Sequence, residues 1–185
     1  MNIFEWFKEI TCKKYTSELV KIKKDSDYYL NRIKILEELV ARSIEIPNIT
    51  ITETEEFKPY ENVELKDLNL VCADLIYYKL PYEKWKEILT EVYIKYQKVH
   101  PYKPEVWDCD DFALLFAGLV AYATKQAGLD KQLAFAISWS PTHAFNTFAT
   151  SDKGIQVYEP QDNNIVGELG KINEPYIVKM IWFMS

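Results

Sequence analysis

Apolar residues recur at alternating steps of four and three near the start of the chain, interrupted only at Ser26. This spacing predicts a long amphipathic helix over residues 15–43, or two helices broken at "KKDSD". The seam consists of Tyr15, Leu19, Ile22, Ser26, Tyr29, Ile33, Leu36 and Val40. It either mediates self-association as a coiled coil or packs against its own domain. Packing is favoured because roughly three heptads are a short coiled-coil run.

The pattern changes at residues 47–63, where β-forming residues alternate with polar ones and two prolines interrupt the run. This predicts an extended connection, with an edge strand as the alternative, between a helical N-terminal extension, residues 1–60, and a main domain, residues 61–185. Pro81 then stands where the first turn of a helix accepts proline. The helix that follows has one apolar face, made of Trp85, Ile88, Leu89, Val92, Tyr93 and Tyr96.

The segment from Asp108 to Gln126 is apolar nearly all round and stops before Gly128, which predicts a buried central helix. Beyond it, "LAFAISWS", "THAFNTFAT", "GIQVYE" and "YIVKMIWF" have the composition and alternation of strands. With "SDKG" as a hairpin turn, they predict an antiparallel sheet. The expected fold class is therefore α+β, with the central helix packed on a C-terminal antiparallel sheet.

Composition and charge narrow the classes of partner. The 185 residues, 48% of them hydrophobic, suffice for a buried core. A formal net charge of -6 argues against nucleic acid and anionic membranes, which select basic patches. No apolar run approaches the roughly 18 residues of a membrane span, and the N-terminus lacks the charge order of a secretory signal. Cys12, Cys72 and Cys109 form no CxxC pair, so free thiols are expected in a chain that is cytoplasmic or carried without a signal peptide.

The candidate chemistry lies in "VWDCDDFALL". Cys109 begins the predicted central helix, where backbone N–H groups and the helix dipole favour a thiolate. Helix capping and first-turn electrostatics explain the aspartates around it. Because those aspartates oppose a thiolate, a cationic partner is needed as well. His143, at the start of a strand, is the candidate for this role, and His100 is the competing base.

Glu159 is the first choice for a third group that fixes the imidazole. Gln161 and Asn146 are the alternatives for orienting the ring or supporting an oxyanion. Side chains on paired antiparallel strands share a face when they lie opposite one another or two residues off. His143 and Glu159 therefore need a hairpin loop with an odd number of residues. An ordinary two-residue turn at Asp152–Lys153 would put Glu159 on the wrong face.

In this order, "WDCDDFALL", "THAFN" and "VYEPQ" resemble the papain-like and transglutaminase-like cysteine peptidases, in particular the C-terminal cysteine-protease domain of fungal agglutinins. The resemblance covers residues 80–185 and implies Cys109 as nucleophile, His143 as base and Glu159 as the residue that orients the imidazole. It also associates calcium with activity. The papain signature C-G-[SA]-C-[WY] is absent, and only the distant Gln97 is a candidate for an oxyanion hole.

Four aspartates are candidate ligands for a divalent cation, because hard cations take carboxylate oxygens. They are Asp108, Asp110, Asp111 and Asp162. The sequence has no D-x-[DN]-x-[DN]-G loop and requires no cofactor, so the expectation of calcium rests on the resemblance. Trp107 and Trp139 adjoin the candidate segments and are expected to wall a substrate groove.

The predicted function is a cysteine hydrolase, a peptidase or amidase acting on a protein or peptide substrate. The Cys109 thiolate would attack an amide carbonyl, His143 would protonate the leaving amine, and water would resolve the thioester. Acyl transfer to an amine, as in a transglutaminase, is left open. The alternative from a different class is a non-catalytic structural or interaction module on the same scaffold. A lectin-like sugar binder ranks last, because the resemblance is to the protease part of the agglutinins.

Overall fold

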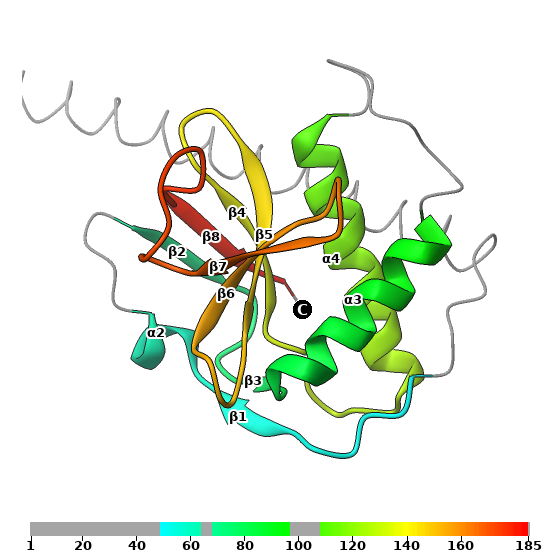
Figure 1. Cartoon of the computed structure of the whole chain (residues 1–185). Helices are drawn as coiled ribbons and strands as arrows, with labels where there is room; N and C mark the ends of the chain where they lie inside the picture. Colours follow the sequence, from blue (N-terminus) through cyan, green and yellow to red (C-terminus); the bar gives the residue numbers. More distant parts are fainter. Residues whose placement is uncertain (1–48, 64–67, 97–107, 185) are drawn as a thin grey trace, which may run out of the picture.

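The computed structural model describes residues 49–63, 68–96 and 108–184. The predicted helix over 15–43, and with it the self-association surface, lies outside these residues. Gln97, His100 and Trp107 also lie outside them. Within the described residues, eight strands form two sheets and three segments are α-helical (Figure 1).

The larger sheet has six strands in the order β2-β8-β4-β5-β6-β7. Neighbouring strands are antiparallel except β2 and β8, which run parallel. The strands are β2 (Asn69–Cys72), β4 (Phe135–Trp139), β5 (Ala144–Ala149), β6 (Ile155–Glu159), β7 (Asn164–Glu168) and β8 (Met180–Phe183). A separate antiparallel pair consists of β1 (Glu55–Phe57) and β3 (Tyr77–Lys79).

Helix α4 (Cys109–Gln126) packs on one face of the six-stranded sheet, against β4 and β5, and α3 (Tyr82–Tyr96) lies beside it (Figure 1). The third helix is the single turn α2 (Pro59–Asn62). Trp85 of α3 is fully buried, and its indole N–H donates to the carbonyl of Ala149 at 2.8 Å, which ties α3 to the end of β5. None of the helices that the structure describes is both long and apolar enough to span a bilayer.

Both faces of the sheet are covered. The α3–α4 side carries the larger core cluster, in which Phe116, Phe148 and Tyr158 are fully buried. On the other side, Phe57 and Tyr77 of the β1–β3 pair pack on Phe183 of β8, with ring centroids 5.6 Å and 5.4 Å away. Strands covered on both faces lose the alternation of a half-exposed strand, so all six residues of β5 are buried.

The fold class predicted from the sequence is wrong. The structure has a six-stranded sheet and a second two-stranded sheet, and the larger one is not built from the C-terminal half alone. Its edge strand β2 precedes α4 in the chain and pairs in parallel with β8. Strand β2 was not predicted from the sequence, because its four residues are too few to show an alternation of apolar and polar positions and its partner lies about a hundred residues away in the chain.

Within the connection predicted over residues 47–63, the structure describes residues 49–63 and contains a strand, β1, as the edge-strand alternative allowed. Strand β1 falls within the predicted N-terminal extension, yet it pairs with β3, placing Glu55 opposite Lys79 and Phe57 opposite Tyr77. Phe57 is buried in the smaller core cluster. The last residues before position 60 therefore pack with the described body of the protein.

Candidate functional site

Cys109 is the first residue of α4, with Asp108 at the N-cap position before it. The Asp108 backbone is extended there, at φ -114°, and its carbonyl accepts the N–H of Phe112 at 3.1 Å. First-turn N–H groups have no intrahelical acceptor, and together with the helix dipole they create a positive potential. The Cys109 thiol is partly exposed. It therefore lies where a negative charge is favoured and a ligand has access.

The β5–β6 hairpin brings His143 and Glu159 together. Ala149 pairs with Ile155, so the loop between the strands comprises residues 150–154. This odd-numbered loop is closed by the Thr150 N–H and hydroxyl, which donate to the carbonyl of Gly154 at 2.9 Å and 2.7 Å. His143 and Glu159 consequently share a face, and Nε2 of His143 lies 2.5 Å from Oε2 of Glu159.

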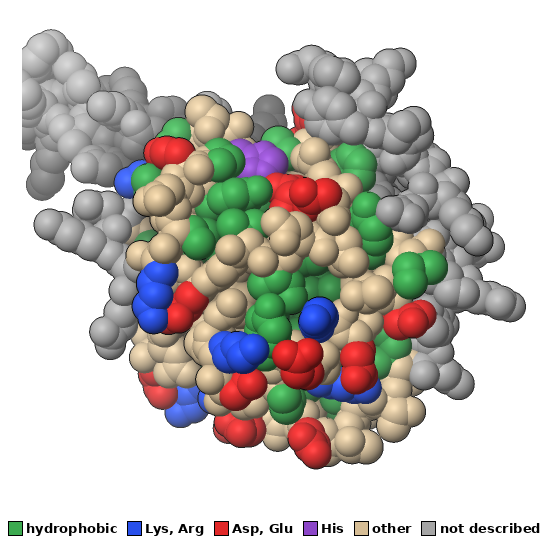
Figure 2. Space-filling model, in the orientation of Figure 1, with side chains coloured by type: hydrophobic (Ala, Val, Ile, Leu, Met, Phe, Trp, Pro, Cys, Tyr) green, Lys and Arg blue, Asp and Glu red, His purple; other side chains and the backbone are tan. Residues whose placement is uncertain are grey.

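His143 lies between an acid and a thiol. Hydrogen bonds with Cys109, first, and Glu159, second, raise the pKa of His143 from 6.5 to about 9, although burial acts in the opposite direction. The imidazole is therefore protonated at neutral pH and places a positive charge beside the Cys109 sulfur. The side chain of His143 is 18% exposed, and Figure 2 shows the histidine at the surface among hydrophobic and acidic side chains.

Glu159 is held by several donors. It is buried, with Oε2 facing His143 and Oε1 accepting the backbone N–H of Gln161 at 3.3 Å. A second donor to Oε2 is the hydroxyl of Tyr176, at 3.2 Å. The sequence does not predict a role for Tyr176, because this residue lies between β7 and β8 and no local pattern connects it to the hairpin.

Asn146 and Gln161 do not take the roles predicted for them. The amide of Asn146 is fully buried and donates to the carbonyls of Ala113 in α4 and Ala136 in β4, at 2.9 Å and 3.1 Å. It therefore joins helix to sheet. Gln161 contacts Glu159 through its backbone N–H, not its side chain. The side chain of Asn146 points away from that of His143, because residues three apart along a strand point to opposite faces of the sheet.

The predicted cation ligands gather only in part. Asp108, Cys109 and Asp110 have potential ligand atoms within 4.8 Å of one another, and neither Asp111 nor Asp162 belongs to this group. Burial, together with a hydrogen bond to Asp108, raises the pKa of Asp110 to about 6. Calcium takes about six to eight oxygen ligands. Two carboxylates and a thiol do not fit that requirement within the described residues.

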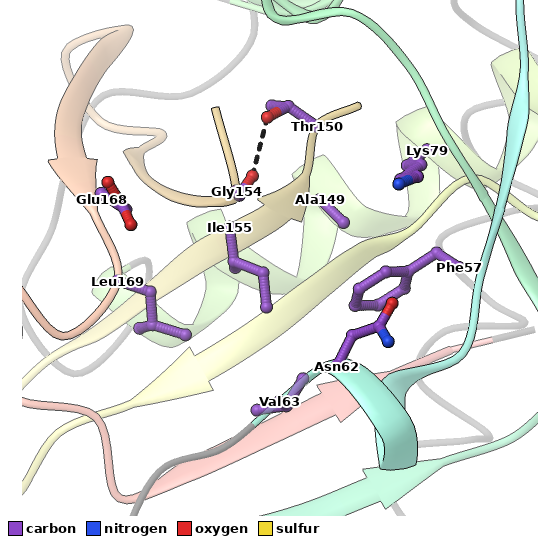
Figure 3. A pocket seen from close by; sticks show the side chains of 10 residues that line it. All are labelled: Phe57, Asn62, Val63, Lys79, Ala149, Thr150, Gly154, Ile155, Glu168 and Leu169. Carbon is purple, nitrogen blue, oxygen red and sulfur yellow. Dashed lines mark hydrogen bonds between the residues drawn. The ribbon is translucent and has the colours of Figure 1, made fainter. Parts of the chain in front are cut away.

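The described residues form a cavity at the turn of the β5–β6 hairpin, away from Cys109, and the predicted groove residue Trp139 does not line it. Trp139, the predicted groove residue that the structure describes, ends β4 and packs partly buried against the larger core. A cavity of about 360 Å³ lies at the opposite end of the β5–β6 hairpin from His143. Figure 3 shows Ile155, Leu169 and Phe57 lining it, with Lys79 and Glu168 on opposite sides. None of the predicted site residues lines this cavity.

No family model matches the chain, and no curated protein matches it. Among solved structures, the chain is similar to one described as "PSL1a-E64 complex", with 20% identity and a TM-score of 0.53 over 64% of this chain and 44% of that one. A second is described as Polyporus squamosus lectin bound to a human-type influenza-binding epitope, Neu5Aca2-6Galb1-4GlcNAc. It has 22% identity and a TM-score of 0.47 over 63% of this chain and 42% of that one.

These findings correct the family and function predicted from the sequence. The description of the structure with a TM-score of 0.53 names no peptidase, and no family model matches the chain. The predicted membership of the papain-like or transglutaminase-like peptidases is therefore wrong. So is the prediction of a cysteine hydrolase with a protein or peptide substrate. The chain spans less than half the length of each of these two structures, and the likeness to the first shows the fold alone.

Proposed function

We propose that this chain is an interaction module whose ligand site is the cluster of Cys109, His143 and Glu159, and that Cys109 holds the ligand as a nucleophilic thiolate. The observation that supports it is the position of the His143 imidazole, 2.5 Å from the Glu159 carboxylate and hydrogen-bonded to the Cys109 thiol. The proposal concerns capture of a ligand and includes no turnover.

Charge supports a reactive thiol at this position. An imidazolium beside a sulfur stabilises the thiolate, and a helix N-terminus acts in the same direction. The buried Glu159 carboxylate lies beside Nε2 of the His143 ring and stabilises its positive charge. The imidazolium is therefore hydrogen-bonded with both the carboxylate and the Cys109 sulfur. Asp108 and Asp110 act against the thiolate. The pKa of Asp110, raised to about 6, keeps part of that opposing charge neutral in mildly acidic solution.

The proposed ligand is a compound with an electrophilic carbon, because that is the kind of atom with which a thiolate forms a bond. Epoxides belong to this class, and one structure that shares the fold is described as "PSL1a-E64 complex". In such a capture the Cys109 sulfur attacks one epoxide carbon, a C–S bond forms and the C–O bond breaks. The alkoxide then takes the proton of the His143 imidazolium. The products are a thioether, a hydroxyl group and a neutral imidazole.

The test measures the rate at which each cysteine is alkylated by iodoacetamide at pH 7, read by peptide mapping. Cys72 is an internal control, because burial raises the pKa of its thiol. An ordinary thiol is only a few per cent ionised at pH 7, so Cys109 is expected to react about tenfold faster or more. H143Q is expected to remove most of that excess. Equal rates at Cys109 and Cys72 would refute the reactive thiol.

A second measurement tests the ligand class. The whole chain is incubated with E64, and the intact mass is measured for the wild type, C109A and C72S. One adduct per chain in the wild type and C72S, and none in C109A, supports capture at Cys109. An adduct that persists in C109A, or no adduct in a chain whose Cys109 reacts rapidly with iodoacetamide, contradicts capture of E64 at this site.

A further inference from the structure

The geometry points to Tyr176 as a positioning residue of this site, one that fixes both the Glu159 carboxylate and the plane of the His143 imidazole. The inference deepens the proposed function and rests on it. Tyr176 lies between β7 and β8, outside the hairpin that carries the other two residues, and its backbone N–H donates to the carbonyl of Asn173 at 3.1 Å.

The hydroxyl of Tyr176 acts on the carboxylate. It donates to Oε2 of Glu159 at 3.2 Å, the same oxygen that faces Nε2 of His143 at 2.5 Å. With the Gln161 N–H on Oε1, each oxygen of the carboxylate has a donor other than the imidazole. A carboxylate held in this way cannot rotate freely about its last torsion, so Oε2 stays aimed at the ring.

The ring of Tyr176 acts on the imidazole. It meets His143 edge to face, with centroids 5.6 Å apart and planes at 70°. Its other neighbour is the ring of Phe145, at 5.2 Å and 78°. Phe145 itself lies 5.8 Å from His143. The three rings thus form one packed group, and edge-to-face aromatic contacts of this kind favour a defined orientation.

Tyr176 remains a donor over the whole pH range in which the site titrates. Burial and the neighbouring Glu159 raise the pKa of its hydroxyl to about 12, above the pKa of about 9 for His143. The proton needed for the hydrogen bond to Oε2 is therefore present whether the imidazole is charged or neutral. As the pH rises, the hydrogen bond from Tyr176 to Glu159 therefore outlasts the ion pair between His143 and Glu159.

The test compares Y176F, which keeps the ring, with Y176A, which removes both ring and hydroxyl. The readouts are the pKa of His143 by NMR titration, with its signal assigned by its absence in H143Q, and the iodoacetamide rate at Cys109. The control is Y78F, which removes a tyrosine-to-carboxylate hydrogen bond of 2.7 Å to Asp130, away from the site. Circular dichroism and a thermal melt establish that each variant is folded.

Y176A is expected to lower the pKa of His143 toward 6.5 by about half a unit, less than the loss of the Glu159 charge would cause, because water then screens the pairing of the imidazole with Glu159. The alkylation rate at Cys109 should fall about tenfold in Y176A and about threefold in Y176F, while Y78F leaves both readouts unchanged. A folded Y176A with an unaltered pKa of His143 would overturn the inference. If the pKa falls but wild-type Cys109 is unreactive, Tyr176 positions the imidazole and the proposed function fails.

Discussion

Replacing Glu159 with glutamine removes the charge that faces His143 while keeping the size of the side chain. The pKa of His143 is about 9 instead of 6.5, a difference worth about 3 kcal/mol at roughly 1.4 kcal/mol per unit. The thiol of Cys109 is the larger cause and Glu159 the second. We therefore expect E159Q to lower the pKa of His143 by about one unit, not to return it to 6.5.

The same change alters how stability depends on pH. Because the pKa of His143 is raised by folding, its contribution to stability is fully present below pH 6.5 and is lost as the pH rises through about 9. Between pH 6 and pH 10, the free energy of unfolding of the wild type should therefore fall more than that of H143Q, by at most about 3 kcal/mol because solvent screens the partly exposed imidazole. In E159Q this excess should shrink by about 1.4 kcal/mol.

Urea unfolding at the two pH values and an NMR titration of His143 measure these quantities. The matched control is E168Q, which removes a carboxylate whose partner Lys171 is exposed, at 2.7 Å, and which should change stability by less than about 1 kcal/mol. If folded E159Q shows the wild-type pKa at His143, the carboxylate does not hold the imidazolium and the reasoning is refuted.

Three further predictions concern the scaffold and the cation site. N146A should lower the free energy of unfolding by about 2 kcal/mol in urea, because two backbone carbonyls lose a buried donor; a loss below about 0.5 kcal/mol would contradict this. G154A should lower the free energy of unfolding by about 1 kcal/mol, because the φ of Gly154 is +67°. G118A should stabilise the protein, because Gly118 lies in a helix with open space at the added Cβ. Thermal melts that rank the two variants the other way would refute the backbone argument. Calcium and EDTA should both leave the alkylation rate of Cys109 unchanged, and a calcium-dependent rate would reveal ligands beyond Asp108 and Asp110.

The calcium expectation came from the resemblance alone, and the structure shows why the residues did not supply it. Asp108 occupies the N-cap position of α4, where its side chain makes no capping hydrogen bond, and Asp111 is buried in the first turn of the helix. Asp162 lies beyond the end of β6. Successive residues of a helix point in different directions, so aspartates that are close in sequence need not bring their carboxylates together. A cation site requires that they do.

The sequence determined the elements whose cause is local. The apolar run after Asp108 produces α4, and the start of that helix places Cys109 at its N-terminus. Alternation produces β5 and β6, and their parity required an odd-numbered loop before His143 and Glu159 could share a face. Each of these depends on hydrogen bonds or side-chain directions among residues that are near neighbours in the chain.

The tertiary structure alone decided the rest. The parallel pairing of β2 with β8 joins segments about a hundred residues apart, and the sequence of either strand is compatible with other partners. Tyr176 reaches Glu159 only because β8 folds back beside β4 and brings the preceding loop over the hairpin. Such contacts are set by the packing of the whole chain, since no short-range pattern specifies which distant segment will cover a given side chain.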